Sequence, residues 1–364
     1  MIKSMNIAWW IQRWAELHPD KPAIIFEEQT ICYGDLCKRA DRTSCWLQSK
    51  GIEKGDRVAV MLDNCPQFID IFLACARLGA IFVPINFRIT GLELDYFIKN
   101  SRPRLFVYGD AFTPVVNSLN LAGYLPPIVI SVVGDKTDNT PVSNFNVETA
   151  KFDGQKAFIT MSLGPENPEE PQVIMYTSGT IGKPKGAVLS HRKTFFNCLN
   201  ADIFFELHSS DMMLTFLPLF HSGGLFIQAA PIFYKGATIV LHRSFNPLKI
   251  YKDIEKYQIT KFLGVPTVYR ELLKVPPENR ADLSSLKVCA GGGEKLTEGL
   301  IEKCTAAGLA FRQIMGQTET SILLWSSEED FLKKPGTVGR PVFHAEVSIL
   351  DDQGKVAKPG GIGE

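Results

Sequence analysis

The sequence YTSGTIGKPKG at positions 176–186 directly follows the apolar run Val173–Met175 and contains three glycines, three aliphatic hydroxyls and two lysines. Glycine allows the backbone to turn tightly and to approach a bulky anion. Hydroxyls and exposed N–H groups donate hydrogen bonds to its oxygens, and lysine adds positive charge. The stretch therefore predicts a loop that binds polyphosphate.

The spacing of this loop differs from that of the P-loop NTPases, which need glycine, four residues and then Gly-Lys-Ser/Thr at the start of a helix. Five positions after Gly179 stands Pro184, and five positions after Gly182 stands Ala187. Lys185 also follows a proline. A P-loop ATPase is disfavoured for these reasons, and a glycine-rich surface turn without a ligand is the structural alternative.

Four further motifs follow the loop, namely LPLFHSGGL at 217–225, AGGGEKL at 290–296, GQTE at 316–319 and GTVGRP at 336–341. These motifs and their order resemble those of the adenylate-forming superfamily, which contains acyl-CoA synthetases, peptide-synthetase adenylation domains and luciferases. The chain is most similar to a fatty-acyl-CoA synthetase. Weaker matches at 33–36 and 78–84 extend the resemblance over nearly the whole chain.

The resemblance implies an α/β fold in which parallel sheets flanked by helices form two lobes, at 1–165 and 166–330. A smaller β-rich subdomain would start near 331. Residues 1–364 resemble the large N-terminal AMP-binding domain of the family, whose mobile C-terminal domain with its catalytic lysine is absent here. We expect such a fragment to be poorly active.

The residue pattern independently indicates a βαβ rhythm. A strand-like run at 56–62 precedes a helical pattern at 67–79, and a second strand-like run follows at 81–85. Parallel sheets covered by helices on both faces are the expected result. Similar strand-like runs recur at 105–108, 128–133, 237–242, 261–265 and 287–290.

Three other regions carry predictions of their own. Residues 7–11 favour an aromatic helix packed on the core, and the polar region 135–171 favours a surface excursion between the lobes. Residues 212–234 contain no charged side chain, but prolines and glycines interrupt them, so we predict strand, turn and buried helix there instead of a membrane span.

By resemblance, each motif has a role in adenylate formation. Glu319 would bind Mg²⁺, Thr318 would bind the α-phosphate, and His221 would form the wall at the carboxylate end of the acyl pocket. Together with Lys185, these residues are the candidate catalytic residues. The outer phosphates would be held by Thr177, Ser178, Gly179, Thr180, Gly182 and Lys185. The adenine would be framed by Gly292, Gly293, Glu294, Met315 and Gly316.

Each assignment has a structural alternative. Glu319 could be an exposed acid at a helix start, His221 an ordinary hydrogen-bonded core residue, and Gly291–Gly293 a site of close packing between strand and helix. Two positions also depart from the family pattern, because Ile181 replaces a hydroxyl and Met315 replaces an aromatic residue. We expect these changes to alter the affinity for ATP without abolishing function.

The resemblance implies an ATP-dependent carboxylate:CoA ligase, an acid–thiol ligase that uses ATP, Mg²⁺ and CoA. A fatty acid is the favoured substrate, and an aryl acid is open. The alternatives are an enzyme that passes the acyl group to a carrier protein, a luciferase-like oxygenase, or a non-catalytic module that binds nucleotide or acyl groups.

Composition sets further limits. The formal net charge is zero, which gives no electrostatic basis for binding nucleic acid. The eight cysteines form no CxxC pair, so we expect reduced, mostly buried thiols and a cytoplasmic protein. Weak association with a membrane surface and a homodimer are open alternatives.

Overall fold

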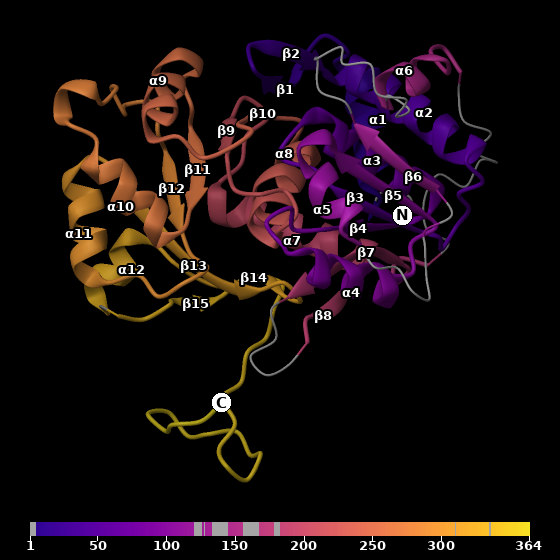
Figure 1. Cartoon of the computed structure of the whole chain (residues 1–364). Helices are drawn as coiled ribbons and strands as arrows, with labels where there is room; N and C mark the ends of the chain where they lie inside the picture. The colour runs from indigo at the N-terminus through magenta and orange to yellow at the C-terminus, as the bar shows by residue number, and fades with distance from the viewer. Residues whose placement is uncertain are drawn as a thin grey trace.

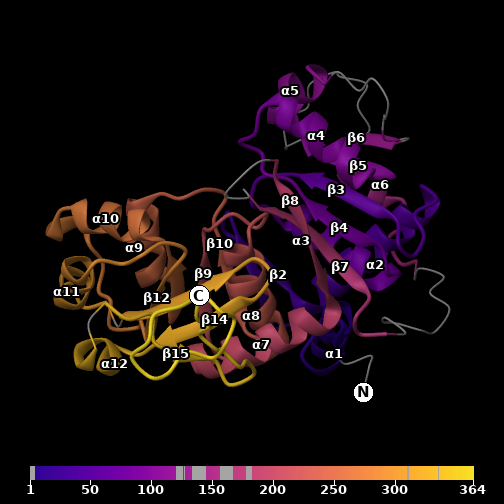
Figure 2. The same ribbon diagram turned by 90° about the horizontal axis from the view of Figure 1, so that it is seen from below.

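A computed structural model of the chain describes residues 5–119, 126, 128–132, 145–155, 167–177, 183–309, 311–334 and 336–364. Two β-sheets, each flanked by helices, form its two lobes (Figure 1). The view from below in Figure 2 separates the lobes, with α4–α6 around one and α9–α12 around the other.

Within the described residues, the smaller sheet has six strands in the order β6-β5-β3-β4-β7-β8. All neighbouring pairs are parallel except β7 and β8, which are antiparallel. Its strands are β3 (Arg57–Met61), β4 (Ile81–Pro84), β5 (Leu105–Gly109), β6 (Ile128–Val132), β7 (Pro171–Thr177) and β8 (Lys185–Ser190). The helical elements that precede or connect them are α1 (Ile7–Leu17), α2 (Tyr33–Ser49), α3 (Pro66–Leu78), α4 (Gly91–Ser101), η2 (Asp110–Phe112), α5 (Thr113–Asn117) and α6 (Phe145–Ala150).

Strand β3 shows why this sheet is covered on both sides. Val58 and Val60 belong to the same core cluster as the apolar face of α3, whereas Ala59 and Met61 pack in the cluster that contains α4. Successive side chains of a strand point to opposite faces, so both faces of β3 are buried. For this reason the sequence of β3 is continuously apolar and does not alternate between apolar and polar residues.

The larger sheet has nine strands in the part of the chain that the structure describes, in the order β15-β14-β13-β12-β11-β9-β10-β1-β2. Its central pairs are parallel, and β2, β14 and β15 pair antiparallel at the edges. The strands are β1 (Pro22–Phe26), β2 (Gln29–Cys32), β9 (Met212–Thr215), β10 (Thr238–Leu241), β11 (Lys261–Gly264), β12 (Val288–Gly291), β13 (Phe311–Gln317), β14 (Ser321–Ser326) and β15 (Arg340–Pro341).

Helices cover both faces of this sheet as well. One core cluster joins it to α7 (His191–Phe205), the π-helix η3 (Gly223–Ala229) and α8 (Ala230–Lys235). A second cluster joins the opposite face to α9 (Pro247–Tyr257), α10 (Pro266–Lys274) and α11 (Glu298–Ala306). The remaining helices are η4 (Pro277–Asn279) and α12 (Glu328–Lys333).

The predicted α/β architecture is confirmed, and the predicted strand-like runs correspond to β3–β6 and β10–β12. Residues on both sides of the boundary predicted near 165 contribute to each sheet, because β1 and β2 lie in the larger sheet and β7 and β8 in the smaller one. Residues 212–234 form β9, η3 and α8 as predicted. No helix of the described residues is long and apolar enough to cross a membrane.

In the part of the predicted surface excursion 135–171 that the structure describes between 145 and 155, six of the eleven residues are exposed, but the segment is anchored to the core. That part contains α6, where Phe145 is 1% exposed and packs edge-on against Trp46 at 5.1 Å between ring centroids. This aromatic contact, the hydrogen bond from Trp46 Nε1 to Glu148 at 2.8 Å and the ion pair of Lys50 with Glu148 attach the segment to α2. Residues 135–144 and 156–166 of the excursion lie outside the described residues.

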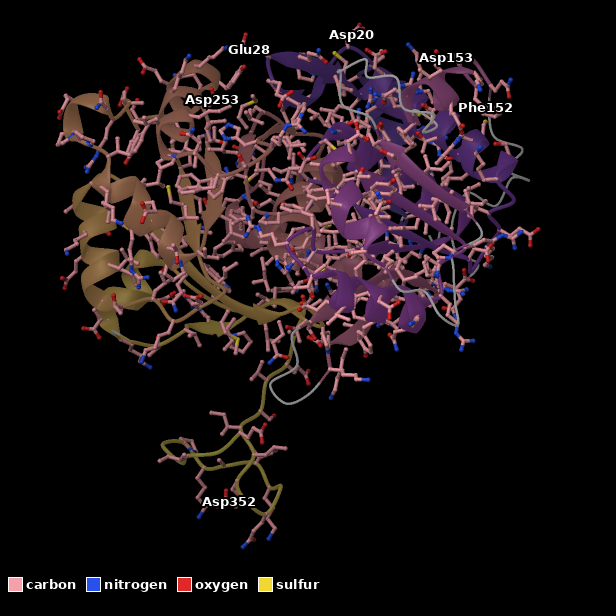
Figure 3. All side chains as sticks on the ribbon, viewed as in Figure 1. Asp20, Glu28, Phe152, Asp153, Asp253 and Asp352 are labelled. Atoms are coloured by element: carbon pink, nitrogen blue, oxygen red, sulfur yellow. The ribbon has the colours of Figure 1, made fainter. Side chains whose placement is uncertain are left out.

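The chain after β15 extends away from both sheets in Figure 1. Asp352, labelled in Figure 3, lies in this segment, far from Glu28 and Asp253 on the main body. This segment contains an isolated bridge between Leu350 and Val356, and Leu350 also exchanges backbone hydrogen bonds with Glu364. The β-rich subdomain predicted near 331 stays a prediction.

Candidate active site

A cavity of about 640 Å³ lies at the carboxyl ends of the parallel strands β9, β11, β12 and β13. Ligands bind at this edge in open α/β sheets, because the loops that leave the strands surround a common crevice. The cavity is lined by Arg88, Leu217, Pro218, His221, Ser222, Gly223, Gly224, Ile227, Leu263, Gly264, Val265, Gly292, Gly293, Glu294, Ile314, Gly316, Gln317, Thr318 and Ser321. The structure thus brings three of the predicted motifs together, at 217–225, 290–296 and 316–319.

The first wall is the turn between β9 and η3, which carries His221. The His221 N–H donates to the Pro218 carbonyl oxygen at 3.1 Å, and Gly224 packs against the same carbonyl. A Cβ atom at Gly224 would lie 2.4 Å from that oxygen, so only glycine fits without moving the backbone. The turn therefore fixes where the imidazole enters the cavity.

The pKa of His221 is lowered, first because the cavity wall removes solvent from the ring and second because Arg88 repels an added positive charge. At neutral pH the ring is therefore neutral. A neutral imidazole can accept or donate a hydrogen bond at the carboxylate end of a bound acid. The sequence analysis did not identify Arg88. Its one sequence feature is a positive charge shortly after the buried strand β4.

The second wall is the glycine turn after β12. The Gly292 N–H donates to the Gly264 carbonyl oxygen at 3.3 Å, which ties this turn to the end of β11. A Cβ atom at Gly292 would lie 2.7 Å from the Ile314 carbonyl oxygen of β13. The close packing expected as a structural alternative is therefore present, and Gly292, Gly293 and Glu294 also line the cavity.

The third wall is the tight turn between β13 and β14. The Gln317 N–H donates to Thr320 Oγ1 at 3.0 Å, which closes the turn over Thr318 and Glu319. Gly316 and Thr318 line the cavity. Met315 is 36% exposed at the end of the same strand, beside the lining residue Gly316.

Glu319 is exposed at the tip of this turn. Its carboxylate makes no hydrogen bond or ion pair with the residues that the structure describes, so its oxygens are available. Mg²⁺ is usually held by one or two carboxylates together with substrate phosphates, and a free carboxylate beside Thr318 fits that requirement. No cluster of three or more metal-binding side chains occurs within the described residues.

The predicted phosphate loop is described only at its base. Thr177 of β7 pairs with Lys185 of β8, and Thr177 Oγ1 donates to the Lys185 carbonyl oxygen at 3.5 Å. The Tyr96 hydroxyl of α4 donates to the Pro184 carbonyl oxygen at 2.9 Å and so anchors the return strand. The residues Ser178, Gly179, Thr180, Ile181 and Gly182 lie outside the described residues.

One further residue of the site was missed. Lys193 of α7 donates from Nζ to Ser321 Oγ, and its ammonium lies 4.4 Å from the Phe226 ring centroid. Loss of solvent lowers the pKa of Lys193 to about 7, although Cys198 and Glu319 act in the opposite direction. Nothing in the sequence pattern of α7 singles this lysine out, because its partner Ser321 is distant in the chain.

The model of the AMP-binding enzyme family matches residues 11–364 of this chain. An indoleacetate–CoA ligase of Aromatoleum aromaticum is 33% identical over 99% of the chain and 69% of its own length. A feruloyl-CoA synthase of an Amycolatopsis species is 30% identical over 100% of the chain and 70% of its own length. A fatty acid–[acyl-carrier-protein] ligase of Streptomyces coeruleorubidus is 29% identical over 96% of the chain and 66% of its own length.

Solved structures agree with this result. The inhibitor-bound N-terminal domain of FACL13 from Mycobacterium tuberculosis superimposes with a TM-score of 0.85 at 25% identity, over 97% of this chain and 86% of that one. The o-succinylbenzoate coenzyme A synthetase of Bacillus subtilis, solved with ATP and a magnesium ion, gives a TM-score of 0.82 at 25% identity, over 98% of this chain and 69% of that one.

Proposed function

Because the chain belongs to the family of AMP-binding enzymes, we propose that it supplies the adenylation site of an ATP-dependent carboxylate:CoA ligase. In the first step, a carboxylate oxygen attacks the α-phosphorus of ATP and pyrophosphate leaves, which gives an acyl-AMP. In the second step, the thiol of CoA attacks the acyl carbon and AMP leaves, which gives the thioester. The observation that carries the proposal is the single cavity shared by His221, Gly292 and Thr318.

The residues of the cavity meet the main electrostatic demand of the first step. Two anions, the carboxylate and the triphosphate, have to approach each other, so the site has to hold them in line and spread their charge. The Thr318 hydroxyl, which lines the cavity, would donate to an α-phosphate oxygen. The guanidinium of Arg88 adds positive charge on the side of His221.

His221 would orient the carboxylate of the bound acid. Its ring is kept neutral, so it positions the incoming carboxylate through a hydrogen bond or a packing contact without forming an ion pair that would hold the acid in its ground state. Mg²⁺ bound at Glu319 would neutralise part of the phosphate charge. Thr177 and Lys185, at the base of the phosphate loop, complete the proposed contacts to the outer phosphates.

A fatty acid is the proposed substrate class, with an aryl acid as the alternative. Leu217, Ile227 and Leu263 give the cavity an apolar wall, and Gly223 and Gly224 leave room beside it. The relatives named above act on indoleacetate, ferulate and fatty acids, so family membership by itself leaves the acid open. The carrier-protein ligase among them supports acyl transfer to a carrier protein as the second candidate reaction.

Single-turnover chemistry tests the proposal. The protein, in excess over the acid, is incubated with ATP and Mg²⁺ and with octanoate, palmitate, benzoate or indoleacetate, and acyl-AMP is detected by mass spectrometry. We expect acyl-AMP from at least one acid, with one AMP unit incorporated for each acid consumed. Nucleotide binding without adenylate from any of the acids would favour the non-catalytic alternative.

A further inference from the structure

The ammonium of Lys193 lies directly behind the wall of the acid cavity. Its Nζ donates to Ser321 Oγ, and Ser321 lines the cavity. The lysine stem is partly buried, and the ammonium rests 4.4 Å from the Phe226 ring centroid. Within the described residues no carboxylate lies within 4.0 Å of Lys193, and its charge is favoured by the ring and, at longer range, by Cys198 and Glu319.

This contact fixes the direction of the Ser321 hydroxyl proton. In its protonated form Lys193 has three donors and no acceptor, so Ser321 Oγ is then the acceptor in the bond between them. The Ser321 O–H is then free to donate elsewhere. Ser222 Oγ lies 3.5 Å from Ser321 Oγ and lines the same cavity. The two hydroxyls therefore form a pair of hydrogen-bond donors that faces a ligand bound in the cavity.

The next turn of α7 confirms that this face of the helix is polar where it meets the wall. Asn197, four residues after Lys193, is 3% exposed and donates from Nδ2 to the Phe226 carbonyl oxygen of η3. Its Oδ1 has no hydrogen-bond partner in the part of the chain that the structure describes. Two polar side chains of α7 therefore hold η3, the helix that carries Ile227 into the cavity.

We propose that Lys193, acting through Ser321 and Ser222, is a specificity-determining residue that selects acids with a second hydrogen-bond acceptor, above all a second carboxylate. An anionic acceptor would receive charge-assisted hydrogen bonds from this patch. A pure hydrocarbon tail would cover the hydroxyls and the ammonium without giving them an acceptor, which is unfavourable.

The acceptor has to belong to a second group of the acid. The reacting carboxylate is consumed at the α-phosphate beside Thr318, where it becomes part of the mixed anhydride. The apolar residues Leu217, Ile227 and Ile314 line the same cavity and provide contacts for the carbon chain. This inference rests on the proposed function and narrows its substrate class from plain fatty acids to acids of the dicarboxylate type.

The test compares two acyl sulfamoyl adenosines of equal chain length by calorimetry, one from hexanoic acid and one from adipic acid with its second carboxylate free. Wild type should bind the adipoyl form at least tenfold more tightly. Lys193→Met keeps the apolar stem and removes the charge, so it should remove this preference while hexanoyl binding is kept. Lys193→Arg should retain part of the preference, and Lys303→Met on the exposed face of α11 should behave as wild type.

The outcomes separate the two claims. Equal affinity of wild type for both mimics, or equal weakening of both by Lys193→Met, would overturn the role of Lys193 and leave the proposed function standing. Failure of both mimics to bind wild type would overturn the proposed function, and the inference with it. Melting temperatures of the variants check that each protein is folded.

Discussion

Asn64 donates from Nδ2 to the Leu217 carbonyl oxygen at 3.0 Å, although 153 residues separate the two. The same amide donates to the His242 carbonyl oxygen at 3.0 Å and accepts the Leu219 N–H at 2.8 Å. Asn64 follows β3 of the smaller sheet, whereas Leu217 and Leu219 precede His221 in the cavity wall. One buried side chain of the first lobe therefore fixes the position of the active-site turn of the second.

Replacing Asn64 by alanine should destabilise the protein and loosen this turn. Two carbonyl oxygens and one N–H would lose their partner in a buried position, which costs about 1–3 kcal/mol for each group left unsatisfied. Urea unfolding should show the loss, and an acyl-AMP mimic should bind more weakly. The exposed Asn117→Ala is the matched control, with stability and binding unchanged. Unchanged binding in Asn64→Ala would contradict a positioning role.

Gly292 should not tolerate a methyl group. The new Cβ atom would meet the Ile314 carbonyl oxygen at 2.7 Å, so β12 and β13 would have to separate. We expect Gly292→Ala to lower the free energy of unfolding by about 1–3 kcal/mol and to weaken binding of ATP. Gly299→Ala on α11, where the added Cβ atom would meet no side chain of the described residues within 4 Å, should be neutral or stabilise by up to about 1 kcal/mol. Equal effects of the two substitutions would refute the packing argument.

Glu319→Gln should affect the metal dependence of nucleotide binding without affecting the fold. The side chain is exposed, so the change in the free energy of unfolding should stay within about 0.5 kcal/mol. Calorimetric titration with ATP in the presence of Mg²⁺ should show weaker binding, and the difference from wild type should vanish in EDTA. Glu302→Gln on the exposed side of α11 is the control. If wild type and Glu319→Gln respond alike to Mg²⁺, Glu319 does not hold the metal.

Stability should fall in mild acid because of His191. This ring is 1% exposed, and burial lowers its pKa to about 4. Below pH 6.5 the unfolded chain takes up a proton that the folded protein does not take up until near pH 4, so the folded state loses stability as pH falls through this window. The loss is about 2 kcal/mol between pH 7 and pH 5.

The measurement is the pH dependence of urea unfolding in wild type and in His191→Gln. The variant should lose less stability than wild type between pH 7 and pH 5, even though it starts from a lower value. Parallel pH profiles for the two proteins would show that His191 does not titrate as argued.

Much of the fold could be predicted because its signals are local. β3, β4 and β5 are apolar runs of strand length between turns, and both faces of their sheet are buried, so the runs are continuous in the sequence. The motifs at Gly292 and Thr318 were also local, because a tight turn at the end of a strand requires particular residue types.

The parts that could not be predicted depend on contacts between distant segments. The pairing of β1 with β10 is set by tertiary packing, and no local pattern near Pro22 indicates it. The bond of Asn64 to Leu217 and that of Lys193 to Ser321 are of the same kind. Phe145 is buried under Trp46 within a polar segment, where one aromatic residue outweighs the surrounding composition.

The central claim is that the cavity beside His221 and Thr318 binds an acyl adenylate. Calorimetric titration with acyl sulfamoyl adenosines carrying octanoyl, palmitoyl, benzoyl and adipoyl groups tests it most directly, because binding does not require turnover. The account predicts tight, stoichiometric binding of at least one form, lost in a Gly292→Ala protein that remains folded at the assay temperature. Absence of binding for every acyl group, in a protein that unfolds cooperatively, would contradict it.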